Sequence, residues 1–222
     1  MTPAAVILDM DGLMVDTEPL YKTAWQQGTA ALGYDLSDVG YAAIVGRPLP
    51  EIEQILMEMF GPAFPLERLR QRWPGLWRDE VARVGIRVKD GLPALLAFIG
   101  ERGLALAVAT STKADWAAFT LERSGLAGRF PVVVTGDQIE RGKPAPDIYL
   151  EAARRLGVEP ARCVALEDSE AGIRSIAAAG MTGILVPHWA PSDAARAAAF
   201  RVVTTLDDAR AVIAGLLSLE GD

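Results

Sequence analysis

The sequence is poor in the residues that build disulfides and zinc sites, with one cysteine and one histidine among 222 residues. A single cysteine excludes a disulfide framework and cysteine-based zinc sites, and Cys163 stands in an apolar run that is typical of a buried strand. The single histidine excludes paired-histidine metal sites, and the chain has no G-x-S-x-G segment for a serine hydrolase. We therefore expect no thiol, zinc or serine-hydrolase chemistry, and we interpret His188 as a loop residue.

Positive charge is also scarce in this chain. Lys and Arg total 22 against 29 Asp and Glu, which gives a net charge of −7 and an isoelectric point near 4.9. This balance has the wrong sign for contact with nucleic acid or an anionic membrane surface. An anionic substrate must therefore meet local positive charge within a site.

Long apolar runs are missing too. The longest uncharged stretch, 175–192, contains two glycines and two prolines, so a helix end, a strand and a loop explain it better than a membrane span. The first residues lack the basic segment that precedes the apolar part of a signal peptide. We expect a cytoplasmic protein with no nucleic-acid or membrane partner.

The chain does contain an alternation of strand-like and helix-like segments. Five short apolar runs and a weaker sixth are typical of buried strands: Ala4–Leu8, Leu104–Ala109, Val132–Thr135, Cys163–Leu166, Thr182–Val186 and Arg201–Thr204. Segments with helical spacing separate most of them: Pro93–Arg102, Ala114–Ser124, Pro146–Leu156, Ser169–Ala179 and Asp207–Leu217. This order predicts an α/β fold, a Rossmann-like parallel sheet with helices on both faces.

The region after the first strand breaks this rhythm. It shows helical spacing in Leu20–Leu32, Pro50–Phe60 and Leu66–Val84, and no convincing strand. We predict a small all-helical cap domain at 16–85, inserted into an α/β core of 1–15 and 86–222. Its large apolar residues are expected to form its own core: Met57, Met59, Phe60, Trp73 and Trp77. An insertion at this point would hang over the carboxyl edge of the sheet, where ligands bind in open α/β folds.

The strongest chemical signal is the segment that ends the first strand. Residues i and i+2 of an extended chain face the same side, so Asp9 and Asp11 can point into one site, and Gly12 lets the chain turn after them. Two carboxylates at a buried strand end are costly unless a cation or a shared proton compensates them. The pair therefore indicates a metal site or acid/base chemistry.

Three further predicted strands end in polar groups. Thr110 and Ser111 follow one strand, Lys143 lies in a loop stiffened by two prolines, and Glu167 with Asp168 ends another strand. Taken singly, the hydroxyls and Asp168 read as helix N-caps, and the lysine as a solvated side chain. The carboxyl edge of a parallel sheet, however, would gather all of them into one pocket.

That pocket would suit a phosphate ester and Mg²⁺. Several hard oxygen donors match the octahedral preference of Mg²⁺, which keeps water ligands that a phosphate can displace. Lys143 and the Thr110 hydroxyl would contact the same phosphate. Phosphoryl transfer needs positioning and charge neutralisation, and a carboxylate can serve as nucleophile beside a second acid/base group.

These segments resemble the haloacid dehalogenase (HAD) superfamily, in its phosphatase branch with a helical cap after the first strand. The resemblance spans essentially the whole chain and rests on four motifs in order. They are the Asp9–Glu18 segment, Thr110, Lys143 within Gly-Lys-Pro-Ala-Pro-Asp, and Glu167-Asp168-Ser169. Within this superfamily, the chain looks similar to β-phosphoglucomutase-like, phosphoglycolate phosphatase-like and pseudouridine-5′-phosphatase-like members.

The resemblance implies a role for each motif residue. Asp9 would attack phosphorus to form an aspartyl-phosphate, and Asp11 would protonate the leaving oxygen and later activate water. The side chains of Asp9 and Asp168 and the backbone carbonyl of Asp11 would hold Mg²⁺. The remaining assignments are phosphate binding by Thr110, Ser111 and Lys143, orientation of the metal's surroundings by Glu167, and substrate specificity from Gly46 and Arg47.

The same resemblance leaves several functions open. A dehalogenase needs neither Asp11 nor a metal-binding Asp168, so we set that activity aside. A β-phosphoglucomutase carries a histidine where this chain has Tyr21, which favours a phosphomonoester hydrolase acting on a small phosphorylated metabolite such as a sugar or nucleoside phosphate. A phosphomutase and a non-catalytic phosphometabolite-binding protein remain alternatives. We expect a monomer.

Overall fold

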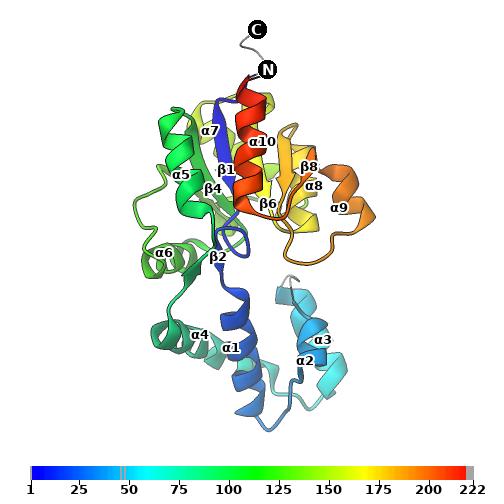
Figure 1. The fold of residues 1–222 in the computed structure, drawn as a ribbon. Coiled ribbons are helices and arrows are strands. Elements are labelled where there is room, and N and C mark those ends of the chain that lie inside the picture. Colours follow the sequence, from blue (N-terminus) through cyan, green and yellow to red (C-terminus); the bar gives the residue numbers. More distant parts are fainter. Residues whose placement is uncertain (1, 46, 48, 219–222) are drawn as a thin grey trace. The chain divides into compact units, whose positions relative to one another are not determined.

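The computed structural model describes residues 2–45, 47 and 49–218. The chain forms two compact units, one of Met1–Asp16 with Arg87–Asp222 and one of Thr17–Ile86 (Figure 1). The predicted boundaries, after residues 15 and 85, each lie one residue before these. Each unit has its own buried interior.

The larger unit is built on a six-stranded parallel sheet with the order β5-β4-β1-β6-β7-β8. The strands are β1 (Ala5–Leu8), β4 (Ala105–Thr110), β5 (Val132–Thr135), β6 (Cys163–Glu167), β7 (Thr182–Leu185) and β8 (Arg201–Val202). Every residue of β1 and β6 is buried, because both faces of the sheet are covered, and this explains why their sequences are apolar up to Glu167, the last residue of β6. The predicted α/β fold with a parallel sheet is confirmed.

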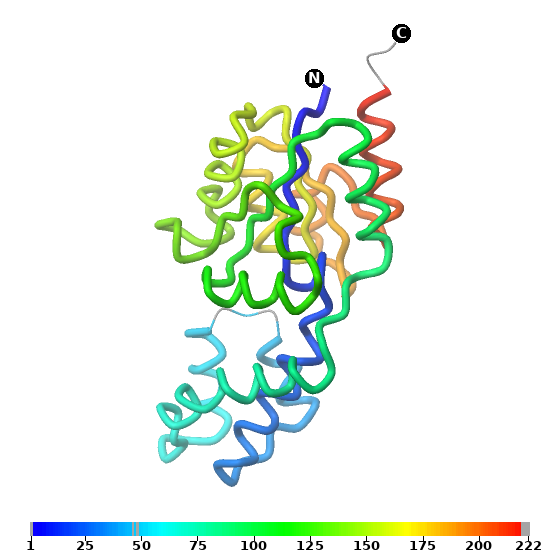
Figure 2. Tube along the Cα trace, turned by 90° about the vertical axis from the view of Figure 1, so that its left-hand side faces the viewer, coloured from blue at the N-terminus to red at the C-terminus, as the bar shows by residue number. Residues whose placement is uncertain are grey.

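Helices cover both faces of this sheet. They are α5 (Leu92–Glu101), α6 (Ala114–Arg123), α7 (Asp147–Leu156), α8 (Glu170–Ala178), α9 (Asp193–Ala198) and α10 (Leu206–Ser218), with single 3₁₀ turns at Gly136–Gln138 and Pro160–Arg162. Helix α7 packs on β1, β4 and β5, and α8 packs on β6 and β7. Figure 2 shows α5 and α10 on the opposite side of the sheet.

The chain leaves and re-enters the larger unit through a small antiparallel ribbon. Strand β2 (Val15–Asp16) pairs with β3 (Arg87–Val88), so that Val15 lies opposite Val88. Neither strand was predicted, because two residues are too few to show a period. Helix α9 was not predicted because its six residues make fewer than two turns, and β8 is two residues shorter than predicted. His188 lies in the exposed loop between β7 and α9.

Within its described residues, the smaller unit is helical. It contains α1 (Glu18–Ala30), α2 (Asp38–Ala42), α3 (Leu49–Phe60) and α4 (Leu66–Val84), and α1 packs along α4. Its interior includes Trp25, Leu56 and Leu69, and Trp77 is fully buried. The prediction that Met59 belongs to this core is wrong, because its side chain is 40% exposed. No helix in the described part of the chain is long and apolar enough to cross a membrane.

Candidate active site

The predicted site residues of the core are brought together at the carboxyl edge of the sheet. Asp9 follows β1 directly, and Thr110 is the last residue of β4, the neighbour of β1 on one side. Glu167 ends β6, the neighbour on the other side, and Asp168 comes next. Lys143 reaches this edge from the loop between β5 and α7. Four segments far apart in sequence thus meet around the end of the central strand.

Lys143 is buried at this edge and pairs with two of its carboxylates. Its ammonium donates to Oδ1 of Asp9 at 2.5 Å, to Oε1 of Glu167 at 2.6 Å and to the backbone carbonyl oxygen of Ala109 at 3.1 Å. An ammonium has three protons, so these acceptors satisfy it completely. The lysine side chain is only 6% exposed, which overturns the solvated reading of a single lysine. Its charge is committed to two carboxylates inside the protein.

Glu167 accepts five hydrogen bonds. Its Oε2 accepts from the backbone N–H groups of Asp168 and Ser169 and from the Ser169 hydroxyl, at 2.9–3.0 Å. Its Oε1 accepts from Lys143 and from the buried hydroxyl of Tyr149. This carboxylate lies so close to the start of α8 that a Cβ on Gly172 would come within 1.8 Å of it. Glu167 is therefore held in one orientation by both strand and helix.

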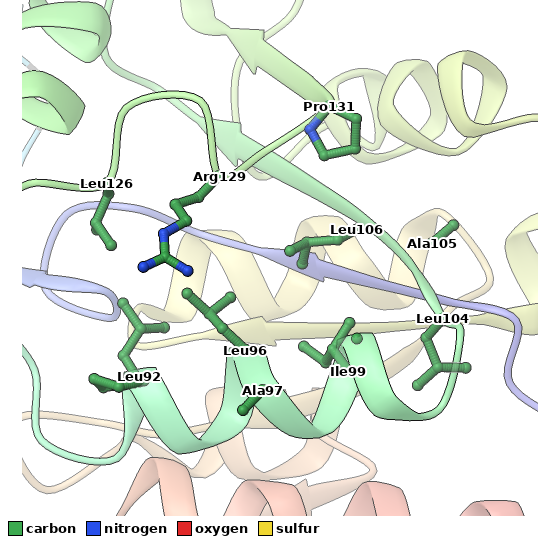
Figure 3. Close-up of a pocket in the computed structure, with 12 residues that line it drawn as sticks. Leu92, Leu96, Ala97, Ile99, Leu104, Ala105, Leu106, Leu126, Arg129 and Pro131 are labelled. Carbon is green, nitrogen blue, oxygen red and sulfur yellow. The ribbon is translucent and has the colours of Figure 1, made fainter.

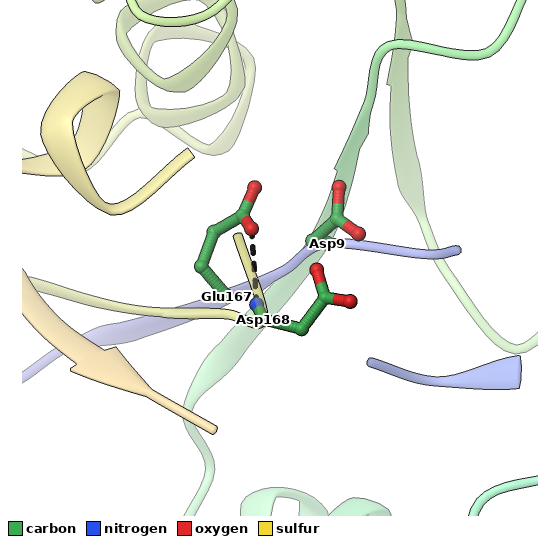
Figure 4. Close-up of side chains that lie close together, drawn as sticks. All are labelled: Asp9, Glu167 and Asp168. Atoms are coloured by element: carbon green, nitrogen blue, oxygen red, sulfur yellow. Dashed lines mark hydrogen bonds between the residues drawn. The ribbon is translucent and has the colours of Figure 1, made fainter. Parts of the chain in front are cut away.

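The acidic side chains form a cluster that suits a metal ion (Figure 4). Asp9, Glu167 and Asp168 each offer a carboxylate oxygen, and these oxygens lie within 4.8 Å of one another. Since the oxygens of Glu167 already accept five hydrogen bonds, Asp9 and Asp168 are the better ligands. No described residue donates a hydrogen bond to the Asp168 side chain, and its carboxylate packs against Gly12, which has a φ of 84°. A hard divalent cation such as Mg²⁺ fits this oxygen donor set.

Electrostatics at this edge also favours a cation. Burial raises the pKa of Asp168 well above its usual value, and the neighbouring charges of Glu167 and Asp9 raise it further. Burial likewise raises the pKa of Asp9, against the lowering effect of Lys143. Burial alone would lower the pKa of Lys143, but its two carboxylate partners raise it above the usual value, so the ammonium stays charged. One internal cation thus faces three acidic groups.

Asp11 is held separately, by hydroxyl groups at the end of β4 and in the loop that follows it. Thr112 donates to Oδ2 of Asp11 at 2.7 Å, and Thr110 lies at 3.5 Å from the same oxygen. Thr110 also accepts from the backbone N–H of Thr112 at 3.1 Å, which fixes the loop. The alternative reading of Thr110 as a helix cap is wrong, because α6 begins after Lys113.

Ser111 and Asp168, which read singly as helix caps, do not cap a helix in the structure. The side chain of Ser111 is exposed and makes no hydrogen bond with any described residue, and its backbone oxygen packs against Gly136 instead. Ser169, and not Asp168, caps α8 by accepting from the backbone N–H of Gly172. Asp168 is therefore left available as a ligand.

The predicted specificity residues belong to the smaller unit. Arg47 is exposed and bonds within its own segment, to the carbonyl oxygen of Ala43 and to Glu51. Gly46 lies outside the described residues. Tyr21, which stands at the histidine position of β-phosphoglucomutase, stacks against Trp73 with ring centroids 5.7 Å apart.

A separate cavity of about 470 Å³ lies between α5 and the amino end of β4 (Figure 3). Its lining is almost entirely apolar, with Leu96 and Leu106 facing each other and Arg129 at its side. It contains no carboxylate or lysine and lies at the strand end that parallel sheets do not use for ligands. The acidic cluster that could hold a metal ion lies instead at the carboxyl edge.

Sequence reasoning missed two residues that contact the site. Thr112 holds Asp11, and Tyr149 holds Glu167. Thr112 directly follows the predicted residues Thr110 and Ser111 but was not itself predicted. Tyr149 lies among apolar residues of a helix, where a tyrosine is usually interpreted as a core residue. A polar tip on an otherwise apolar helix face was the signal that could have found it.

The fold and this acidic edge define a hydrolase of the haloacid dehalogenase type. A family profile described as haloacid dehalogenase-like hydrolase matches residues 3–180, and the chain belongs to this family. It is 34% identical to a phosphorylated carbohydrates phosphatase of Thermotoga maritima, over 97% of this chain and 93% of that protein. It is 33% identical to a fructose-1-phosphate phosphatase of Escherichia coli, over 82% and 95%.

A similar solved structure also comes from Thermotoga maritima. It is described as a candidate β-phosphoglucomutase and is 32% identical to this chain. It covers 97% of this chain and 99% of its own, with a TM-score of 0.83. The predicted family is thus confirmed.

Proposed function

We propose that this protein is a Mg²⁺-dependent phosphomonoester hydrolase that acts on a small sugar phosphate through an aspartyl-phosphate. The observation that supports it best is the arrangement of Asp9, whose Oδ1 is bound by the buried ammonium of Lys143 beside the open carboxylate of Asp168. A carboxylate in this setting has one oxygen oriented and another outside that contact, and it can act as a nucleophile.

In the first step the substrate's phosphorus is attacked by a carboxylate oxygen of Asp9. A bond forms between this oxygen and phosphorus, and the bond from phosphorus to the sugar oxygen breaks. Asp11, oriented by the Thr112 hydroxyl, gives its proton to the departing oxygen. In the second step Asp11 takes a proton from water, the water oxygen bonds to phosphorus, and the bond to Asp9 breaks to release orthophosphate.

The other residues supply charge and position. When the phosphoryl group reaches Asp9, Lys143 can turn a proton from Asp9 toward a phosphoryl oxygen without leaving Glu167. Thr110 and the loop around Ser111 offer further donors on the same side. Mg²⁺ held by Asp9 and Asp168, with the backbone carbonyl of Asp11, would neutralise phosphate charge. Glu167 would orient both Lys143 and the surroundings of the metal.

The names of the relatives support a sugar phosphate as substrate. Two of them are phosphatases of phosphorylated carbohydrates and of fructose 1-phosphate. The residues at 16–85 would serve as the cap that selects the leaving group, with Arg47 and Gly46 in its specificity loop. A monomer is proposed as the working form, to be checked by size-exclusion chromatography with light scattering.

The first experiment is phosphate release from a panel of sugar and nucleoside phosphates, with Mg²⁺ and with EDTA. We expect release that requires Mg²⁺ and that is abolished in Asp9→Asn, because an amide is not a nucleophile. Release that persists in EDTA, or in the Asp9→Asn variant, would contradict the proposed chemistry. A folded wild type that binds orthophosphate and turns over nothing would favour the binding-protein alternative.

A phosphomutase is the second candidate, because one of the similar structures is described as a candidate β-phosphoglucomutase. The test is conversion of β-glucose 1-phosphate to glucose 6-phosphate, run beside the phosphate assay. Isomerisation without phosphate release would favour the mutase. The absence of histidine from 16–85, with Tyr21 packed against tryptophan, favours the hydrolase.

A further inference from the structure

A tyrosine with no assigned role lies directly beneath the proposed catalytic edge. Tyr149, in the first turn of α7, is fully buried. Its hydroxyl donates to Oε1 of Glu167 at 3.0 Å, and this is the same oxygen that accepts from Lys143 at 2.6 Å. The ammonium of Lys143 also lies 5.2 Å from the centroid of the tyrosine ring. One side chain thus contacts the site lysine through its ring and, by way of Glu167, through its hydroxyl.

The Tyr149 hydroxyl and the Lys143 ammonium compete for the same acceptor, Oε1 of Glu167. Oε1 of Glu167 has two donors, and the phenol uses lone-pair density that would otherwise attract Lys143 more strongly. Without the phenol, the lysine would be the sole donor to Oε1. Its ammonium would then move toward Glu167 and away from Asp9. The lysine stem has four flexible carbons, so its position depends on such competing acceptors.

The ring and its helix make this hydroxyl a fixed support. Tyr149 belongs to the interior between α7 and the sheet, and α7 packs on three strands, including β1, which ends at Asp9. Its buried neighbours on the same helix are apolar: Ile148, Ala152 and Ala153. A phenylalanine would fill the same volume. The hydroxyl is therefore an addition to packing, and the site carboxylate is its partner.

Burial supports the donor role of the phenol. Burial and the charges of Glu167 and Asp9 raise the pKa of Tyr149 well above its ordinary value. The hydroxyl therefore keeps its proton and stays a donor at neutral pH. The face of the Tyr149 ring adds a second attraction for the Lys143 ammonium, which is a cation–π interaction.

We propose that Tyr149 is a positioning residue, which fixes Glu167 and thereby sets the distance between the Lys143 ammonium and Asp9. This inference rests on the proposed phosphatase function and assigns a residue that acts through Glu167 and not on the substrate. Loss of the hydroxyl alone would leave the core packed and would weaken the nucleophile's electrostatic support.

The test compares Tyr149→Phe with Ser124→Ala. Ser124 is the control, because its hydroxyl is also hydrogen-bonded but donates only to the backbone carbonyl oxygens of Thr120 and Leu121, at the C-terminal end of α6. With acetyl phosphate as substrate, kcat of Tyr149→Phe should fall about tenfold with KM within about twofold. Ser124→Ala should keep the wild-type kcat. A Tyr149→Phe variant with wild-type kcat would overturn the inference, while an inactive wild type would instead refute the proposed function.

A double-mutant cycle separates positioning from general destabilisation. If Tyr149 acts through the carboxylate, Tyr149→Phe should lower kcat by less than about threefold in a Glu167→Gln background. Equal losses in both backgrounds would overturn the inference, because the hydroxyl would then act by another route.

A third measurement does not depend on turnover. The chain has four lysines, so the ammonium signals of ¹⁵N-lysine-labelled protein are few, and Lys143→Met identifies that of Lys143. Protons of the buried, fully bonded ammonium should exchange slowly with water in the wild type and faster in Tyr149→Phe. Unchanged exchange would show that the hydroxyl does not hold Lys143 in place.

Discussion

Lys143→Met is the substitution whose effects follow most directly from the structure. Methionine keeps the length of the side chain and removes its charge. In the native protein that charge lies between the carboxylates of Asp9 and Glu167, at 2.5 and 2.6 Å, with all three side chains nearly or fully buried. Removing one partner of a buried ion pair typically costs about 3–5 kcal/mol, because the remaining charge is left uncompensated. We expect a loss of this size in the free energy of unfolding at pH 7.

The loss should depend on pH through Glu167. Burial tends to raise the pKa of Glu167, but Lys143 and the other hydrogen-bond donors hold it below the usual value, so removal of Lys143 raises the folded-state pKa of this carboxyl. In the variant the buried carboxyl must give up its proton as the pH rises above the unfolded-state value, about 4.3, and the folded state loses stability there, whereas the wild-type carboxylate is already ionised. The difference in stability between wild type and Lys143→Met should therefore grow as the pH rises above about 4.3.

The assay is urea unfolding followed by circular dichroism, in EDTA, at several pH values. Lys22→Met is the matched control, because Lys22 pairs with Asp38 at 2.9 Å on the surface, with side chains 38% and 77% exposed. An exposed pair contributes about 0–1 kcal/mol, so this variant should unfold like the wild type. In addition, kcat of Lys143→Met should fall by at least about 10²-fold, as for loss of a donor to transition-state charge. Equal stabilities of the two variants at pH 8 would refute the buried ion-pair reasoning.

Three further predictions concern single residues. Asp11→Asn should lower kcat by about 10²–10⁴-fold, the usual contribution of a general acid/base, and an unchanged rate would remove Asp11 from that role. Thr112→Val removes the hydroxyl at 2.7 Å from Asp11 and should reduce kcat more than the fold's stability; Ser124→Ala, which loses a hydroxyl bonded only to backbone carbonyls, is its control. Burial raises the pKa of the Cys163 thiol to about 11, so a disulfide reagent should react with it at pH 8 only upon unfolding, and rapid labelling of the native protein would contradict its burial.

The sequence carried the strands and the acids that end them, because a buried strand and a polar end are both local patterns. Asp9 and Glu167 could be placed at one edge from the rule that parallel strands share their carboxyl ends. The bonds made by Thr112 and Tyr149 could not be predicted, because each joins residues far apart in the chain, 101 and 18 positions, and neither has a periodic signature. The five hydrogen bonds to Glu167 likewise could not be predicted, because three of them depend on the backbone geometry just before α8, which helix propensities do not specify.

The ribbon of β2 and β3 has a consequence for how such a protein can be altered. The two points at which the chain leaves and re-enters the α/β unit are direct partners in a ladder, with Asp16 opposite Arg87. A two-residue turn such as Asn-Gly is enough to close an antiparallel pair of this kind. We therefore expect that the whole segment 17–86 can be exchanged or removed as one unit, and that the sheet that carries Asp9 keeps its connectivity.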